Sequence, residues 1–233
     1  MILKNIPNTI TCLNLLSGCM ACVMAFQYNY TGVFIFVGLA AVFDFLDGLA
    51  ARALHAYSDL GKELDSLSDV VSFGVAPGCL VYSFLASYAD GTGLPFIAFL
   101  LPIFAALRLA KFNIDTRQTS SFLGLPVPSM GLFWVSFIPS IYLFTQSYSP
   151  LTLVIVVALV IVFSALMVSE IPMFSLKFKS LKWKDNAWSF SLVGISALIL
   201  ILFAVWHIFI LSLAAIIVVY IGMSLIKVVI DKK

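Results

Sequence analysis

The chain has 233 residues, of which 62% are hydrophobic and only 10% are charged. Soluble domains carry about 25% charged residues, so this composition excludes a protein whose whole surface faces water. The formal net charge of +2 is small, and we expect no nucleic-acid partner.

Apolar stretches long enough to cross a bilayer recur along the whole chain. A helix needs roughly 20 apolar residues to cross the hydrocarbon core, and loops or open sheet edges cannot face lipid. The sequence therefore predicts an all-α, polytopic membrane protein with about eight transmembrane helices. We place them at 9–27, 31–52, 63–88, 95–113, 127–145, 149–168, 189–206 and 208–227. Only Trp206 and His207 separate the last two, so one kinked span over 189–227 is the alternative.

The positive charges indicate an orientation independently of the span count. Lys and Arg residues gather in cytoplasmic loops. With the N-terminus inside, every Lys and Arg of this chain lies on the inner side, whereas the loops assigned outside, such as QYNYT and ASYADGTG, contain none. We therefore expect a multi-pass protein of the cell membrane with both termini cytoplasmic.

Acidic residues gather around the second and third spans. Asp44 and Asp47 are three residues apart and Asp65 and Asp69 are four apart, so each pair shares one face of a helix. Both pairs lie near the predicted cytoplasmic end. Because the two spans run antiparallel, the two acidic faces can meet across one helix pair.

Four converging carboxylates without matching basic partners repel one another unless they are protonated or hold cations. Carboxylate oxygens suit Mg²⁺, Mn²⁺ or Ca²⁺, and a pair of such ions is suited to phosphoryl transfer. The small residues Gly48 and Ala51 leave room for a diphosphate near the backbone, and Arg52 can grip a phosphate oxygen. The pattern favours a metal-dependent enzyme with its site facing the cytoplasm.

An ion- or proton-coupled transporter is the alternative from another class, because such proteins also place carboxylates in the membrane. A transport pathway predicts carboxylates spread through the membrane depth. Here the interiors of the fourth to eighth spans carry none. The distribution of acidic residues therefore favours the enzyme.

The acidic stretch resembles the signature of the CDP-alcohol phosphatidyltransferase family at every fixed position. It reads Asp44-x2-Asp47-Gly48-x2-Ala51-Arg52-x8-Gly61-x3-Asp65-x3-Asp69. The resemblance implies a membrane enzyme, usually a homodimer, that moves a phosphatidyl group from a CDP-linked lipid to an alcohol and releases CMP. It also implies a six-helix core. We therefore expect a single domain over 1–233, with the core at about 1–168 and an additional helical pair at about 189–227.

The resemblance also implies roles for individual residues. The expected metal ligands are Asp44, Asp47, Asp65 and Asp69. The last of these is also the expected general base, which takes the proton from the acceptor hydroxyl. The expected lining of the CDP site is Gly48, Ala51, Arg52 and Gly61. The opening IPNTITCLNLLSG resembles the segment that precedes this motif in the family, so Asn8 and Thr11 are expected to reach the nucleotide.

Three later stretches resemble the phosphatidylserine synthase branch of that family. They are LRLAKFNID (107–115), FLGLPVPSMG (122–131) and ALMVSEIPMFSLK (165–177). L-serine is therefore the expected acceptor, and CDP-diacylglycerol or an archaeal diether analogue is the expected donor.

Serine presents a carboxylate that Arg108 or Lys111 could bind, and Asn113, Ser120 or Ser121 could orient the rest of the molecule. Ordinary anchoring of the fourth span at the inner surface is the other interpretation of the two basic residues. A phosphorylated acceptor, such as glycerol 3-phosphate or an inositol phosphate, is the alternative substrate, because Arg117 could join them in binding its phosphate.

Overall fold

The computed structural model describes residues 2–89, 91–115, 122–144, 149–174 and 183–231. Helices make up nearly all of this part. In chain order they are α1 (Ile2–Phe26), α2 (Tyr30–Ala53), α3 (Asp59–Asp69), a π-helical segment (Val70–Val75), α4 (Ala76–Ala89), a 3₁₀ segment (Leu94–Phe99), α5 (Leu100–Ile114), α6 (Val127–Phe144), α7 (Pro150–Val168), α8 (Trp183–Val205) and α9 (Leu211–Asp231). The short strands β1 (Phe122–Leu123) and β2 (Pro172–Met173) pair antiparallel.

The predicted fold class is confirmed. Among the described residues, 7 helical stretches are long and apolar enough to cross a bilayer, and the shorter apolar helix Val127–Leu143 accompanies them. The chain at 189–227 forms two helices, α8 and α9, rather than one kinked helix. Some helices exceed the predicted spans: α1 begins at Ile2 and α9 continues to Asp231, because a helix can extend past its apolar part into the polar boundary.

Three helices are followed, two residues after their ends, by a residue in the left-handed backbone conformation. Tyr28, His55 and His207 have φ values of 56°, 48° and 58°. After α8, the His207 N–H donates to the Ala204 carbonyl and the next N–H donates to that of Phe203, which satisfies carbonyls at the helix end. Histidine tolerates this conformation better than most residues. His207 therefore stops α8 and lets α9 begin as a separate helix.

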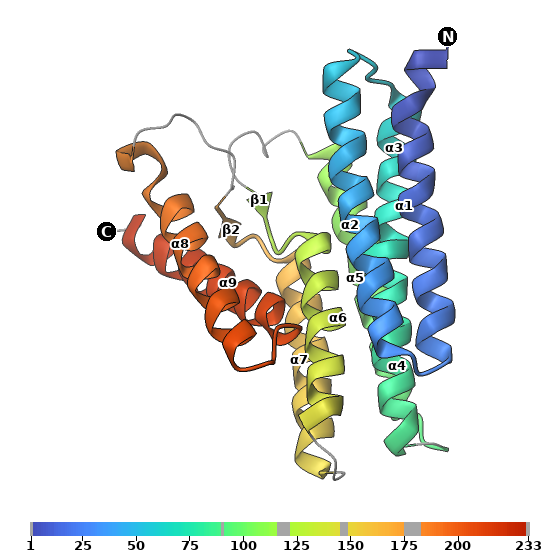
Figure 1. The fold of residues 1–233 in the computed structure, drawn as a ribbon, viewed down its shortest axis with the longest axis vertical. Coiled ribbons are helices and arrows are strands. Elements are labelled where there is room, and N and C mark those ends of the chain that lie inside the picture. The colour runs from blue at the N-terminus through green and yellow to red at the C-terminus, as the bar shows by residue number, and fades with distance from the viewer. Residues whose placement is uncertain (1, 90, 116–121, 145–148, 175–182, 232–233) are drawn as a thin grey trace.

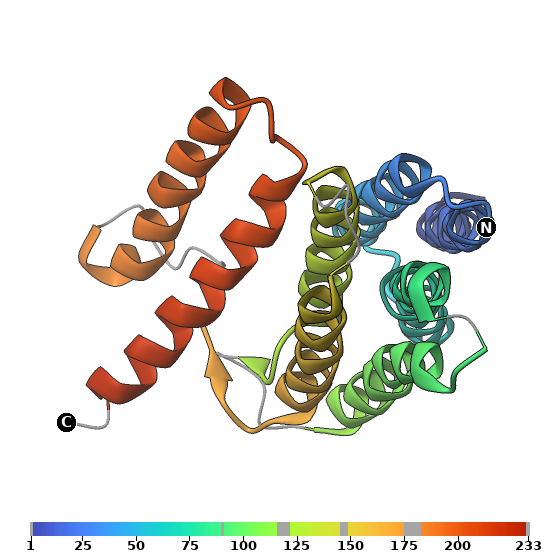
Figure 2. The same cartoon turned by 90° about the horizontal axis from the view of Figure 1, so that it is seen from below.

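The helices form two groups (Figure 1). In one group α1 to α5 lie side by side, and α6 and α7 pack against them, with α6 contacting α2 and α4 and α7 contacting α5. In the other group α8 and α9 diverge from the bundle, as the view from below shows (Figure 2). The helix α9 joins the two groups because it contacts both α6 and α8. Ser136 of α6 supports this joint, since its hydroxyl donates to the Ile210 carbonyl and accepts from the Ala214 N–H.

The outward faces of these helices are apolar, as a lipid environment requires. Exposed side chains include Leu16 on α1, Phe45 and Leu49 on α2, and Leu202 on α8. A soluble protein rarely exposes large contiguous apolar patches. These faces therefore agree with a protein that spans the membrane.

A widened helical turn follows directly on Asp69. The π-helical segment joins α3 to α4, and two glycines let neighbouring helices pack on its backbone. A Cβ atom at Gly131 of α6 would lie 2.9 Å from the Cα of Phe73, and one at Gly18 of α1 would lie 2.8 Å from the Cα of Ser72. Small residues allow such close approach between membrane helices. The region around Asp69 is thus held from both sides.

Candidate active site

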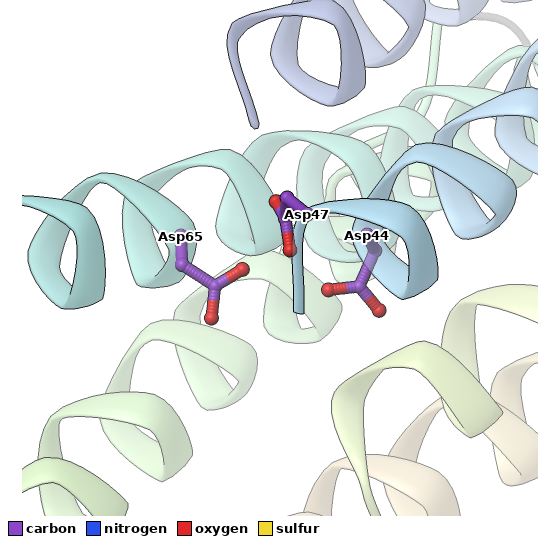
Figure 3. Close-up of side chains that lie close together, drawn as sticks. All are labelled: Asp44, Asp47 and Asp65. Atoms are coloured by element: carbon purple, nitrogen blue, oxygen red, sulfur yellow. The ribbon is translucent and has the colours of Figure 1, made fainter. Parts of the chain in front are cut away.

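Three of the predicted metal ligands come together between α2 and α3 (Figure 3). Asp44 and Asp47 on α2 and Asp65 on α3 each offer a carboxylate oxygen, and these oxygens all lie within 4.8 Å of one another. Asp47 is buried and the other two are half-buried. Within the described structure none of the three forms a salt bridge, and Oδ1 of Asp65 is buried without a hydrogen-bond partner. The cluster therefore concentrates negative charge and presents a carboxylate oxygen that is free to bind.

Asp69 lies one turn further along α3 and does not belong to this group of three. It is only 7% exposed. The Asn14 side-chain nitrogen of α1 donates to Oδ1 of Asp69 over 3.4 Å, while Oδ1 of Asn14 is buried without a partner in the described residues. Asn14 was not among the predicted site residues. The sequence feature that could have identified Asn14 is its polar amide side chain in the middle of an apolar helix.

The helix α1 is tied to both acidic helices by side-chain hydrogen bonds. Thr11 Oγ1 lies 2.6 Å from Oδ2 of Asp47 and donates to it. Ser68 donates to the Thr11 carbonyl over 3.3 Å, and Ser72 donates to the Asn14 carbonyl over 3.0 Å. These contacts fix the position of α1 along its axis relative to α3, and therefore the position of Asn14 beside Asp69.

A cavity of about 230 Å³ opens beside the acidic cluster. Five residues predicted for CDP binding line it: Asn8, Thr11, Gly48, Ala51 and Gly61. Arg52, the sixth, lies outside the lining; it is exposed, and its Nε donates to the Gly48 carbonyl over 2.9 Å. Tyr57, Ser58 and Lys62 also line the cavity, although the motif does not specify them. The lining thus includes one cationic side chain, Lys62, whose ammonium donates to the Asn113 carbonyl over 3.2 Å.

The two motif glycines meet different surroundings. A Cβ atom at Gly61 would lie 3.0 Å from Oδ1 of Asn8 and 3.1 Å from Oγ of Ser58, which caps the start of α3 by accepting from the Gly61 N–H. A Cβ at Gly48 would meet only the far end of Arg52, at 3.9 Å. Gly61 therefore permits close packing within the protein, whereas Gly48 leaves space on the side of the cavity.

Arg108 is the most deeply placed of the residues predicted for acceptor binding. It is 6% exposed, its guanidinium lies 5.3 Å from the centre of the Phe112 ring, and its Nε has no partner among the described residues. Asp69 and Tyr220 both lie within electrostatic range of it. A residue that only anchors a helix end reaches for the polar boundary. Arg108 is instead a buried cation near the predicted general base.

Lys111 lines a small cavity together with Arg108, and the other predicted acceptor residues are engaged elsewhere or not described. Lys111 pairs with Glu170 at 3.7 Å, and both side chains are largely exposed, so this ion pair contributes little to stability. Asn113 donates to Ser66 over 2.9 Å and accepts at its carbonyl from Lys62, and so joins α5 to α3. Ser120 and Ser121 lie outside the described residues.

Comparison with known proteins finds relatives across most of the chain. The model of the CDP-alcohol phosphatidyltransferase family matches residues 4–168. A CDP-diacylglycerol–serine O-phosphatidyltransferase from Bacillus subtilis is 41% identical over 154 residues, which cover 64% of this chain and 80% of that protein. An archaetidylserine synthase from Methanothermobacter thermautotrophicus is 35% identical over 171 residues, which cover 71% of this chain and 68% of that protein. A Helicobacter pylori protein named like the first is 36% identical over 131 residues, about 55% of each chain.

Proposed function

We propose that this chain, which belongs to the CDP-alcohol phosphatidyltransferase family, transfers the phosphatidyl group of a CDP-linked lipid to the hydroxyl of L-serine and releases CMP. The names of the Bacillus and Methanothermobacter relatives support serine as the acceptor. The observation that carries the proposal is the convergence of three family aspartates beside a cavity lined by Gly48, Ala51 and Gly61 of the same motif. The donor is CDP-diacylglycerol or its diether analogue.

The acidic cluster fits a divalent cation. Its donors are all carboxylate oxygens, which Mg²⁺, Mn²⁺ and Ca²⁺ prefer, and the unpartnered Oδ1 of Asp65 is available as a ligand. Asp44, Asp47 and Asp65 would hold the ion, and Asp69 would serve a second ion or the acceptor. When bound, such ions stabilise negative charge on a diphosphate.

The residues around the cavity position the donor. Thr11 orients the Asp47 carboxylate through its hydrogen bond, and Asn8 approaches the same space from α1. The absence of side-chain bulk at Gly48 lets a diphosphate come close to the α2 backbone. Lys62 supplies a positive charge to a phosphate oxygen once its ammonium leaves the Asn113 carbonyl. Arg52 reaches the same phosphates only after it leaves the Gly48 carbonyl.

Asp69 and Arg108, with Asn14 beside them, position the acceptor. Asp69 accepts the proton of the serine hydroxyl, and the hydroxyl oxygen attacks the phosphorus bonded to the lipid oxygen. The bond from this phosphorus to the bridging oxygen of the diphosphate breaks, and CMP leaves with its electron pair. The amide of Asn14 keeps the Asp69 carboxylate oriented, and Arg108 binds the serine carboxylate near it. No covalent enzyme intermediate is needed.

We further propose that the site faces the cytoplasm and that the protein works as a homodimer. The one-sided distribution of Lys and Arg supports the orientation. In the fold, the end of α2, the start of α3 and the end of α5 lie at one end of the bundle, so the acidic cluster is near one membrane surface (Figure 1). A donor lipid can therefore reach it from the membrane.

The test is release of CMP by the purified protein from CDP-diacylglycerol, with Mg²⁺ or Mn²⁺ and a panel of alcohols. We expect serine to support release and glycerol 3-phosphate and inositol phosphate not to. Preference for a phosphorylated acceptor would keep the chemistry and replace the substrate. No release with any alcohol, together with ion flux through vesicles that contain the protein, would replace the enzyme with a transporter.

A further inference from the structure

Another cavity among the described residues lies at Arg108 and is narrow. Its volume is about 10 Å³, roughly the space of one water molecule. Its walls include Leu123 of β1, Met167 at the end of α7 and Ser169 directly after that helix. In so small a space the position of the walls decides whether a carboxylate can reach the guanidinium.

The wall at β1 is held by the segment that follows α7. Phe122 and Leu123 pair with Met173 and Pro172 of β2. The Gly124 N–H continues this attachment by donating to the Ile171 carbonyl just before β2, whereas the Leu125 N–H donates to the Leu166 carbonyl of α7, each over 3.0 Å. β1 and Gly124 can therefore move little unless β2 moves with them, while Leu125 is attached to α7.

β2 is in turn held by α9, a helix outside the family match. The Tyr220 hydroxyl donates to the Phe174 carbonyl over 3.1 Å, and both residues are buried. The two rings lie 5.1 Å apart, and the Phe174 ring is also 6.5 Å from that of Trp188 on α8. The helices α8 and α9 thus hold Phe174, the residue directly after β2, through one hydrogen bond and two aromatic contacts.

We infer that Tyr220 is a positioning residue for the acceptor side of the site: its bond to the Phe174 carbonyl fixes β2, and β2 fixes the β1 wall at Arg108. The identity of the acceptor in this inference rests on the proposed function. The structural link from Tyr220 through β2 to β1 does not depend on it. It assigns the helices beyond residue 168 a part in acceptor binding. Tyr220 itself does not have to touch the substrate.

The test uses the full-length Tyr220→Phe variant, which removes the hydroxyl and keeps the ring. We expect the KM for serine to rise about two- to tenfold, the range for one lost hydrogen bond, with the KM for the CDP-lipid nearly unchanged. Tyr82→Phe is the matched control, because Tyr82 stacks on Phe99 away from both cavities. An unchanged serine KM, or an equal rise in the KM of both substrates, overturns the inference.

Hydrogen exchange separates the inference from the proposed function. In Tyr220→Phe the amide of Gly124 should exchange faster than in the wild type, with no substrate present, while the amide of Leu125, which bonds to α7, and the amides of α1 and α2 should be unaffected. This result is expected whichever alcohol the enzyme uses. Unchanged exchange at the Gly124 amide would overturn the link between α9 and β1 even if serine proves to be the substrate.

Discussion

Thr11 Oγ1 lies 2.6 Å from Oδ2 of Asp47, so the first helix holds one of the three clustered carboxylates in place. Partners that orient a metal ligand typically account for about 10–100-fold in metal affinity or activity. We expect Thr11→Val to raise the metal concentration needed for half-maximal CMP release by about that factor. Thr9→Val is the control, because Thr9 is exposed on the same helix and donates only to the Asn5 carbonyl. Equal metal titrations of the two variants would show that this bond does not orient the ligand.

Asp65 supplies the unpartnered oxygen of the cluster, so its charge should matter most for the metal. We expect Asp65→Asn to lower the rate of CMP release by on the order of a hundredfold, with partial recovery at high Mn²⁺ concentration. Asp59→Asn removes an exposed carboxylate from the start of the same helix and should change release by less than about twofold. If both variants behaved alike, the cluster would not be the metal site.

Asn14 donates to Asp69 from the middle of α1, and its loss should affect the chemical step rather than substrate binding. We expect Asn14→Leu to lower kcat by about tenfold or more, a part of what a positioned general base contributes, with the KM of each substrate unchanged. Ser17→Ala serves as the control, since Ser17 only bonds the Leu13 carbonyl of its own helix. A rise in KM with kcat unchanged would assign Asn14 to binding instead.

Gly48 leaves space at the cavity beside the acidic cluster, because a methyl group added there would meet nothing closer than the end of the Arg52 side chain, at 3.9 Å. Gly48→Ala should therefore fold normally yet obstruct the diphosphate. We expect a higher KM for the CDP-lipid and an unchanged KM for serine. Gly38→Ala adds the same methyl group to α2 where nothing lies within 4 Å, and it should leave both KM values unchanged. Normal donor binding by Gly48→Ala would remove this glycine from the site.

Gly124 has a φ of 75°, and a Cβ atom there would lie 2.9 Å from the Ser169 carbonyl oxygen and 3.0 Å from that of Leu166. Gly124→Ala should therefore cost more than the 1–3 kcal/mol or so expected from the backbone conformation alone. Gly91 has a similar φ of 74° but open space around it, so Gly91→Ala isolates the backbone cost. Thermal unfolding of the two variants measures the difference, and equal midpoints would show that β1 can withdraw from α7.

The membrane fold could be predicted from the sequence because lipid imposes a simple rule. Every stretch such as 149–168 must be a helix if it is apolar throughout and long enough to span. The meeting of Asp47 and Asp65 could be predicted as well, since helical spacing and an antiparallel turn leave few other arrangements. These features depend on local pattern and on the thickness of the bilayer.

Other features depend on contacts between distant segments, which periodicity does not reveal. The π-helical segment after Asp69 looks like ordinary apolar helix in the sequence. The motif assigns Arg52 to the nucleotide, yet its side chain turns back to the Gly48 carbonyl. The bond from Tyr220 to Phe174 links segments 46 residues apart. Such contacts follow from packing, so they had to be seen in the structure.

The helical turns of α2 that hold Asp44 and Asp47 also carry Phe45 and Leu49 on the exposed side. A helix with its side chains is about 10 Å across, so whatever amphiphile covers those residues is within about that distance of the acidic cluster. For a biochemist, detergent is therefore a reaction component rather than a mere solvent. Variants of this protein should be ranked in several detergents, and in bilayers, before a weak one is declared inactive.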